Sequence, residues 1–265
     1  MATRPQPLCD LTLARSAAVC GVFTDIDDTL TAEGGLEPAA LAGLQSLRAA
    51  GLPVIAITGR PMGWSLPFAL AWPVAAIVAE NGAVALIRNG SALLTEYAQD
   101  EATRLHNAER LRAVSAMVLR EVPGATPAQD SPGRVTDIAI DHSEFAHLDS
   151  AAIGRVVAVM QREGMNATVS SIHINGWFGE HTKLSGARWM LQRLFGRELD
   201  AEVERWVYVG DSTNDQAMFS HFPLSVGVAN LRDFAEQLHT WPAYITEGER
   251  GAGFAEVAAR LLPGT

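Results

Sequence analysis

The chain has 265 residues, of which 48% are hydrophobic and 19% are charged, which suffices for one large domain or for a core with a smaller module. Its formal net charge of −10 argues against nucleic acid as a partner, because proteins hold phosphate backbones with basic surfaces. No apolar run is long enough to cross a membrane, and the amino terminus lacks a basic segment followed by an apolar one, so we expect no membrane contact and a cytoplasmic location.

The first predicted element is a buried strand that ends in acidic residues. The apolar run over residues 19–23 stops at residues 25–29, which read Asp-Ile-Asp-Asp-Thr. Open α/β sheets bind ligands at the carboxyl ends of their strands, and this is where Asp25 and Asp27 would lie. A solvated acidic turn would explain the same two residues, so the strands that follow decide between these interpretations.

Two further buried strands also end in polar residues. Residues 53–57 lead into residues 58–61, Thr-Gly-Arg-Pro, and residues 74–79 lead into the segment that contains Asn81. Proline favours the first turn of a helix, so free backbone N–H groups should follow Thr58 and provide a seat for an anion. For Thr58 taken alone, an ordinary helix cap is the competing interpretation.

The pattern changes after residue 84. Asn89-Gly90 predicts a tight hairpin turn. Helices and half-polar strands then alternate, with helices over residues 101–121 and 151–163 and strands over residues 135–140 and 168–174. Half-exposed strands combined with helices indicate an α+β module. We therefore predict a cap inserted at residues 88–176, and a catalytic core formed by residues 1–87 and 177–265.

After the insertion the chain returns to buried strands. Lys183 opens a predicted helix, and the apolar strand over residues 206–209 ends in residues 210–215, Gly-Asp-Ser-Thr-Asn-Asp. A further apolar strand covers residues 224–228. Strands that alternate with helices predict an α/β core with a doubly wound, parallel sheet.

The carboxylates at the predicted strand ends need a positive partner. Asp25, Asp27, Asp211 and Asp215 would converge in one crevice. Two negative charges ~4 Å apart repel by roughly 4 kcal/mol at an effective dielectric constant of ~20. An all-oxygen pocket without His or Cys suits Mg²⁺, which in turn makes a phosphate group tolerable there. With Lys183 as a second positive charge, we expect a Mg²⁺ cofactor and a small phosphate ester as substrate.

Four separated motifs together resemble the haloacid dehalogenase superfamily. They are the acidic stretch at residues 25–29, the strand-terminal Thr58, the helix-opening Lys183, and the second acidic stretch at residues 210–215. The position of the insertion, between Thr58 and Lys183, and the segment 80–83 resemble the type IIB, Cof-like branch of that superfamily. This branch includes sucrose-phosphate, trehalose-phosphate and mannosylphosphoglycerate phosphatases.

The resemblance implies a phosphatase that works through an aspartyl-phosphate intermediate. Asp25 would attack the phosphorus atom. Asp27 would protonate the leaving oxygen and then activate water, as a general acid and base in turn. Lys183 would hold Asp25 and the phosphate together.

The resemblance also implies the metal and phosphate ligands. Asp25, the main-chain carbonyl of Asp27, and Asp211 would hold Mg²⁺, and Asp215 and Asn214 would support the metal or Lys183. The phosphate and the rest of the substrate would be bound by Thr58, Gly59, Asn81 and Asn214.

Two other functions share parts of this pattern. A phosphosugar mutase has the same motifs, but it needs a phosphorylated activator and returns phosphate to its substrate. A phospho-aspartate regulatory domain also has acidic residues, a Thr and a Lys on a parallel sheet, but Asp27 would have no role in it. For a phosphatase we expect a sugar phosphate as substrate, with Asn175 and Trp177 as candidate contacts at the base of the cap. Arg60 would pair with the substrate or with Glu80.

Overall fold

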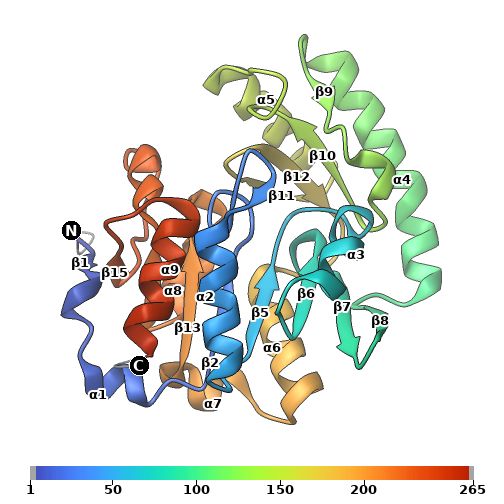
Figure 1. Cartoon of the computed structure of the whole chain (residues 1–265). Coiled ribbons are helices and arrows are strands. Elements are labelled where there is room, and N and C mark those ends of the chain that lie inside the picture. Colours follow the sequence, from blue (N-terminus) through green and yellow to red (C-terminus); the bar gives the residue numbers. More distant parts are fainter. Residues whose placement is uncertain (1–3, 263–265) are drawn as a thin grey trace.

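A nine-stranded sheet runs through the larger part of the molecule, which the computed structural model describes over residues 4–262 (Figure 1). Counted across the sheet, all strands from the β1 edge to β6 pair in parallel. At the other edge, β7 and β8 pair antiparallel. The order across the sheet is β1 (Gln6–Pro7), β15 (Tyr244–Ile245), β14 (Leu224–Gly227), β13 (Trp206–Gly210), β2 (Gly21–Thr24), β5 (Val54–Ile57), β6 (Ala76–Ala79), β7 (Val84–Asn89) and β8 (Ala92–Tyr97).

The central strands are buried because they are short, uninterrupted apolar runs. Every residue of β2, β5, β6 and β13 is buried. Successive side chains of a strand point to opposite faces of the sheet, so Val22 and Val54 enter one hydrophobic core, whereas Phe23 and Ile55 enter another. This arrangement confirms the predicted doubly wound α/β fold.

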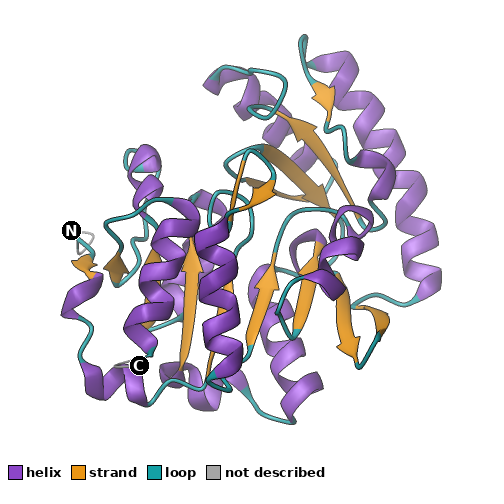
Figure 2. Ribbon diagram, viewed as in Figure 1, coloured by secondary structure: helices purple, strands orange, loops and turns teal. Residues whose placement is uncertain are grey.

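Helices cover both faces of the sheet (Figure 2). One face is covered by α2 (Pro38–Ala49), α3 (Met62–Ala71) and α9 (Arg250–Leu261), and the other by α6 (Lys183–Phe195), α7 (Leu199–Glu202) and α8 (Gln216–His221). The short α1 (Leu13–Ala17) lies against α9, and a small hairpin of β3 (Thr31–Ala32) and β4 (Gly35–Leu36) follows β2. None of the helices within residues 4–262 is both long and apolar enough to cross a membrane.

A second, antiparallel sheet forms the cap. Its order is β11 (Asn166–Val169), β12 (His173–Trp177), β10 (Asp137–Asp141) and β9 (Thr126–Pro127). The helices α4 (Glu101–Glu121) and α5 (Ser150–Arg162) pack on it through a separate hydrophobic core that includes Val118, Ile140 and Met160. The cap lies over the edge of the core sheet where the parallel strands end (Figure 1).

Two details differ from the sequence prediction. The hairpin strand β8 pairs with β7 along its whole length, so it belongs to the core sheet and not to the inserted module. We therefore propose that the cap begins after Tyr97 rather than at residue 88. The predicted strand over residues 168–174 is two strands, because the Ser170 hydroxyl accepts the N–H groups of Ile172 and His173 and closes a turn. Residues 1–3 and 263–265 of the predicted core lie outside the described residues.

Candidate active site

The carboxyl ends of β2, β5 and β13 meet at one place, because these strands are neighbours in parallel pairs. Asp25 directly follows β2, Thr58 follows β5, and Asp211 follows β13. Lys183, the first residue of α6, reaches the same place, with its Nζ 3.0 Å from Asp25 Oδ1. The sheet order therefore brings together the four motifs that are separated in the sequence.

The chain turns sharply after Asp25. The Ile26 carbonyl accepts hydrogen bonds from the N–H groups of Thr29, Leu30 and Thr31. Asp28 has a left-handed backbone with a φ of 52°, which is uncommon for a residue other than glycine. Asn230 Nδ2 donates to its carbonyl at 3.0 Å and helps to hold this conformation. The turn leaves Asp25 buried and Asp27 half-buried, so the two carboxylates have different environments.

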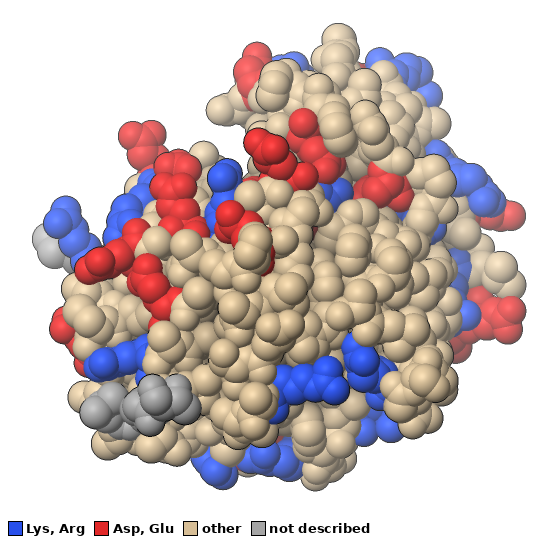
Figure 3. All heavy atoms as spheres, viewed as in Figure 1, with Lys and Arg blue, Asp and Glu red and all other residues tan. Residues whose placement is uncertain are grey.

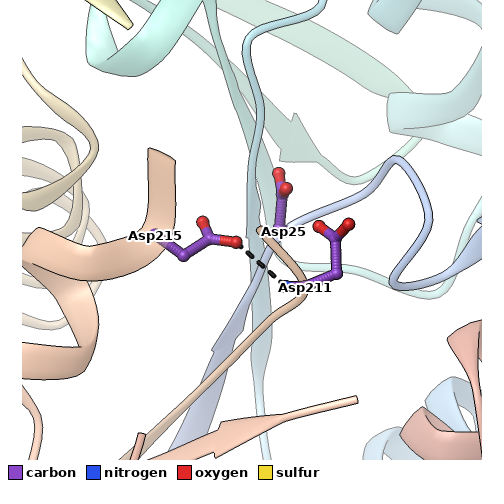
Figure 4. Close-up of side chains that lie close together, drawn as sticks. All are labelled: Asp25, Asp211 and Asp215. Carbon is purple, nitrogen blue, oxygen red and sulfur yellow. Dashed lines mark hydrogen bonds between the residues drawn. The ribbon is translucent and has the colours of Figure 1, made fainter. Parts of the chain in front are cut away.

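Three carboxylates, which Figure 4 shows, and the ammonium group of Lys183 form the buried centre of the site. Asp25, Asp211 and Asp215 each place one carboxylate oxygen within 4.8 Å of the other two. Lys183 Nζ bridges two of them, at 3.0 Å from Asp25 Oδ1 and 2.8 Å from Asp215 Oδ1. Since only one ammonium faces three carboxylates, the fully ionised cluster would carry an excess of negative charge.

Asp215 is held by hydrogen-bond donors on both of its oxygens. These donors are Lys183 Nζ and the Tyr208 hydroxyl on Oδ1, and the N–H groups of Asp211 and Ser212 on Oδ2. A Cβ atom on Gly210 would lie 2.4 Å from Asp215 Oδ2, so this packing requires glycine at position 210. Asp215 therefore orients Lys183 and the main chain of Asp211.

Burial and the neighbouring charges shift the pKa values of the residues in this cluster. Burial and the neighbouring carboxylates raise the pKa of Asp211 well above its ordinary value. Burial also raises the pKa of Asp25 to about 7, although Lys183 acts in the opposite direction. Burial opposes the charge of Lys183, but Asp215 and Asp25 together keep the pKa of the ammonium above its ordinary value.

On the face shown in Figure 3, further acidic side chains gather where the cap meets the core.

The cluster fits a hard divalent cation such as Mg²⁺. Its donors are carboxylate oxygens, which such cations prefer. Asp211 Oδ2 is buried and has no hydrogen-bond partner within residues 4–262. Because both oxygens of Asp215 already accept hydrogen bonds from the protein, Asp25 and Asp211 are the carboxylates that would hold the ion.

The loop after β5 supplies the candidate phosphate seat. Thr58 Oγ1 accepts the N–H of Arg60 at 2.9 Å and lies 3.5 Å from Asp27 Oδ2. Gly59 is closely packed, since a Cβ atom there would lie 3.1 Å from Asn175 Oδ1 and 3.4 Å from the Asn81 side-chain amide. Asn81 is buried beside this loop, and its Nδ2 has no partner in the described part of the chain. Thr58, Gly59 and Asn81 thus lie together next to Asp27.

Arg60 pairs with Asp27 and not with Glu80. Arg60 Nε lies 2.9 Å from Asp27 Oδ1, and its other nitrogens contact Asp130 and Glu144 of the cap. The Glu80 carboxylate accepts hydrogen bonds from other donors, namely the N–H groups of Met62, Val135 and Thr136 and the Thr136 hydroxyl. Of the two expected partners of Arg60, Glu80 is therefore wrong, and a substrate group stays a prediction. Glu80 instead joins the start of α3 to the cap.

The remaining candidates contact the site less directly. Asn175 Nδ2 donates to the Gly59 carbonyl at 3.2 Å and to Asp137 Oδ2 at 3.0 Å, so it ties the cap to the phosphate seat. Trp177 is buried, and its indole N–H donates to the His181 carbonyl, which makes it a packing residue at the base of the cap. Asn214 Oδ1 accepts the Ser212 hydroxyl at 3.1 Å.

The sequence interpretation did not include Asp130, Glu144 or His173 among the site residues. Asp130 and Glu144 contact Arg60 directly, and His173 Nε2 lies 2.8 Å from Glu144 Oε2. The sequence feature that points to further acidic residues in the site is the position of Arg60 directly after the phosphate seat. A buried guanidinium at that position needs carboxylate partners, but nothing in the sequence says which of the cap's acidic residues provide them.

Comparisons with known proteins agree with this geometry. The family model described as haloacid dehalogenase-like hydrolase matches residues 22–121. A Thermoplasma acidophilum protein superimposes with a TM-score of 0.69 at 15% identity, over 92% of this chain and 98% of its own. Sucrose-phosphatase from Synechocystis, solved with sucrose and phosphate, gives a TM-score of 0.64 at 16% identity, over 91% of this chain and 96% of its own.

The likeness extends to a eukaryotic phosphatase. The C-terminal domain of trehalose-6-phosphate phosphatase from C. albicans gives a TM-score of 0.69 at 13% identity, and the match covers 98% of each chain. No curated protein sequence matches this chain significantly. The structural matches therefore establish that the chain has this fold, cap included.

Proposed function

We propose that this chain is a haloacid dehalogenase-like hydrolase, the family whose model matches residues 22–121, and that it hydrolyses the phosphate ester of a small metabolite, a sugar phosphate, with Mg²⁺ as its cofactor. The observation that carries this proposal is the buried Lys183 ammonium between Asp25 and Asp215, beside Asp211. Structures of a sucrose-phosphatase and a trehalose-6-phosphate phosphatase share the fold, which supports the choice of a sugar phosphate.

In the proposed reaction, Asp25 is the nucleophile and Asp27 moves the protons. An Asp25 oxygen forms a bond to phosphorus while the ester P–O bond breaks, and Asp27 gives its proton to the leaving oxygen, which departs as an alcohol. Asp27 then takes a proton from the water that attacks the aspartyl phosphate, and inorganic phosphate is released with Asp25 restored. Asp27 is suited to this role because its Oδ2 lies beside Thr58, where the phosphate would bind.

The other residues of the site would bind the phosphoryl group and orient the reacting side chains. Lys183 would pair with both Asp25 and a phosphoryl oxygen, and Thr58 and Gly59 would contact the remaining oxygens. When bound to Asp25 and Asp211, Mg²⁺ would supply positive charge that offsets the charge on the phosphoryl group. Asp215 keeps Lys183 in place by accepting a hydrogen bond from its Nζ.

One observation favours a phosphatase over a mutase. A mutase of this kind needs a phosphorylated activator, so its cap must provide a cation for a second phosphate. Arg134 of the cap contacts the phosphate seat: its Nη1 donates to Asp137 and the Gly59 carbonyl and its Nη2 to Asp130, whereas its buried Nε has no partner within residues 4–262. This arginine is therefore committed to contacts within the protein.

A screen of phosphorylated metabolites for release of inorganic phosphate in Mg²⁺ tests the proposal. We expect sugar phosphates to rank above phosphopeptides, and Asp25→Asn to abolish turnover while the protein stays folded. The matched control is Asp200→Asn, at an exposed aspartate that pairs with Arg188. Phosphate release by Asp25→Asn at the parent rate would refute the nucleophile. Phosphate kept stably on Asp25 after treatment with acetyl phosphate would instead support a regulatory domain.

A further inference from the structure

Arg60 lies between the proposed proton donor and the cap. Its side chain is almost completely buried, with 5% exposed. Nε binds Asp27 Oδ1 at 2.9 Å, Nη1 binds Asp130 Oδ2 at 3.2 Å, and Nη2 binds Glu144 Oε1 at 2.8 Å. One guanidinium therefore joins three carboxylates that come from three different loops, and only the first of these loops belongs to the core.

The two cap carboxylates are themselves held in place. Glu144 Oε2 contacts His173 Nε2 at 2.8 Å, and His173 is a buried residue of β12. Asp130 Oδ1 accepts Arg134 Nη2 at 3.1 Å, and the same arginine binds the Gly59 carbonyl. Both partners of Arg60 are thus fixed to the body of the cap, so the position of the guanidinium depends on where the cap lies.

The contacts of Asp27 explain why this matters for the reaction. Arg60 occupies Asp27 Oδ1, and Asp27 Oδ2 faces the Thr58 hydroxyl at 3.5 Å. The oxygen that must exchange a proton with the leaving group is therefore the one that Arg60 leaves free. If the guanidinium lost Asp130 and Glu144, it would no longer be fixed in one orientation, and the Asp27 carboxylate could rotate away from the phosphate seat.

We propose that Arg60 is a positioning residue that lets Asp27 act as a proton donor only when the cap is seated on the core. This inference rests on the proposed function, because it concerns the proton that Asp27 delivers. It assigns Asp130 and Glu144 to the reaction although neither contacts the reacting atoms. It also predicts that phosphate esters whose leaving oxygen must be protonated depend on Arg60 more than esters whose leaving group departs as a stable anion.

The test compares two phosphate esters whose leaving groups differ. A nitrophenyl ester leaves as a stable anion and needs little help from an acid, whereas an alkyl ester such as a hexose phosphate needs the proton. For each variant, kcat and KM are measured on both esters, and the ratio of the two kcat values is compared with that of the parent. The variants are Arg60→Met, Arg60→Lys, Asp130→Asn and Glu144→Gln. The control is Glu121→Gln, which removes an exposed cap carboxylate paired with Arg162.

General acid catalysis contributes roughly 10²–10⁴-fold, so we expect Arg60→Met to lower the alkyl-to-aryl ratio by about 10-fold or more. Arg60→Lys should restore part of the ratio, because it keeps a donor for Asp27. Asp130→Asn and Glu144→Gln should lower the ratio by about 3-fold each through kcat rather than KM, although both lie in the cap. Glu121→Gln should leave it unchanged.

Several results would overturn the inference. If Arg60→Met slowed both esters equally, Arg60 would have only a structural role. If Asp130→Asn and Glu144→Gln behaved like Glu121→Gln, the cap would not act through Arg60, and this result remains decisive even if Arg60→Met fails to fold. If the parent hydrolysed neither ester, the proposed function itself would be refuted and the inference with it. Parent activity on both esters with an unchanged ratio in every variant would refute the inference alone.

Discussion

Replacing Asp211 by Asn should make the metal-free protein more stable and remove its response to Mg²⁺. Asp211 is buried, one of its oxygens has no partner within residues 4–262, and it lies beside the carboxylates of Asp25 and Asp215. Asparagine has almost the same shape but carries no charge. The substitution therefore removes repulsion from the empty cluster and removes one ligand from the loaded cluster.

The size of the effect follows from the geometry of the cluster. At a separation of 4.8 Å, two carboxylates repel by roughly 3.5 kcal/mol at an effective dielectric constant of ~20. An ionised Asp211 would meet two such neighbours, which gives about 7 kcal/mol before Lys183 and protonation reduce the repulsion. We expect a gain of ~2 kcal/mol in the free energy of unfolding, or roughly 4–8 °C in Tm for a chain of this length.

The pH dependence has a definite sign. Burial raises the pKa of Asp25 from its ordinary value of 3.8 to about 7 in the folded protein, and it also raises the pKa of Asp211. The folded protein then binds more protons than the unfolded chain, so the metal-free stability should fall as the pH rises from about 4 to about 7. Above about pH 7, Mg²⁺ should restore the lost stability, because it binds the ionised carboxylates.

Thermal unfolding of the parent and of Asp211→Asn, each in chelator and in excess Mg²⁺, measures both effects. The parent should melt higher with Mg²⁺, whereas the variant should melt higher than the parent in chelator and respond little to the ion. The exposed Asp200→Asn serves as the control for removal of one negative charge. A variant that is no more stable than the parent in chelator, or that Mg²⁺ stabilises equally, would show that these carboxylates do not repel one another.

Three further predictions concern the same centre. Lys183→Met should lower kcat by more than about 100-fold and destabilise the metal-free protein by ~3 kcal/mol, because it leaves two buried carboxylates without their shared cation. Activity near that of the parent would contradict the proposed role of Lys183 between Asp25 and the phosphate. Ca²⁺ should inhibit the Mg²⁺-activated enzyme in steady-state assays, because it accepts more oxygen ligands and can engage both oxygens of Asp25, and full activity in Ca²⁺ would exclude this explanation. Gly210→Ala should reduce both Tm and activity, since its Cβ would lie 2.4 Å from Asp215 Oδ2, whereas Gly154→Ala, which meets no neighbour within 4 Å, should not.

The core of the site could be predicted because each part has a local signal. β2, β5 and β13 are apolar runs that stop abruptly at Asp25, Thr58 and Asp211, and parallel neighbours place their ends together. The start of the cap could not be predicted in the same way. A hairpin such as β7–β8 has the same sequence pattern whether it extends the core sheet or begins an inserted module.

The contacts between cap and core were the least predictable part. Arg60 is separated by 70 residues from Asp130 and by 84 from Glu144, and their meeting depends on how two separately folded sheets lie against each other. Glu80 is nearer to Arg60 in the sequence than Asp130 and Glu144 are. It was unavailable because the turn at Glu80 and Asn81, both with a positive φ, directs its carboxylate to main-chain donors instead.

The Glu80 carboxylate also has a consequence for the order in which products leave. It is completely buried and binds Val135 and Thr136 of the cap as well as Met62 of the core, immediately beside the phosphate seat. We propose that the cap turns about this point when it opens. In the proposed reaction the alcohol departs before the aspartyl phosphate is hydrolysed, so the phosphoryl group would stay enclosed while the alcohol leaves. We therefore expect inorganic phosphate to leave last and to act as a competitive product inhibitor.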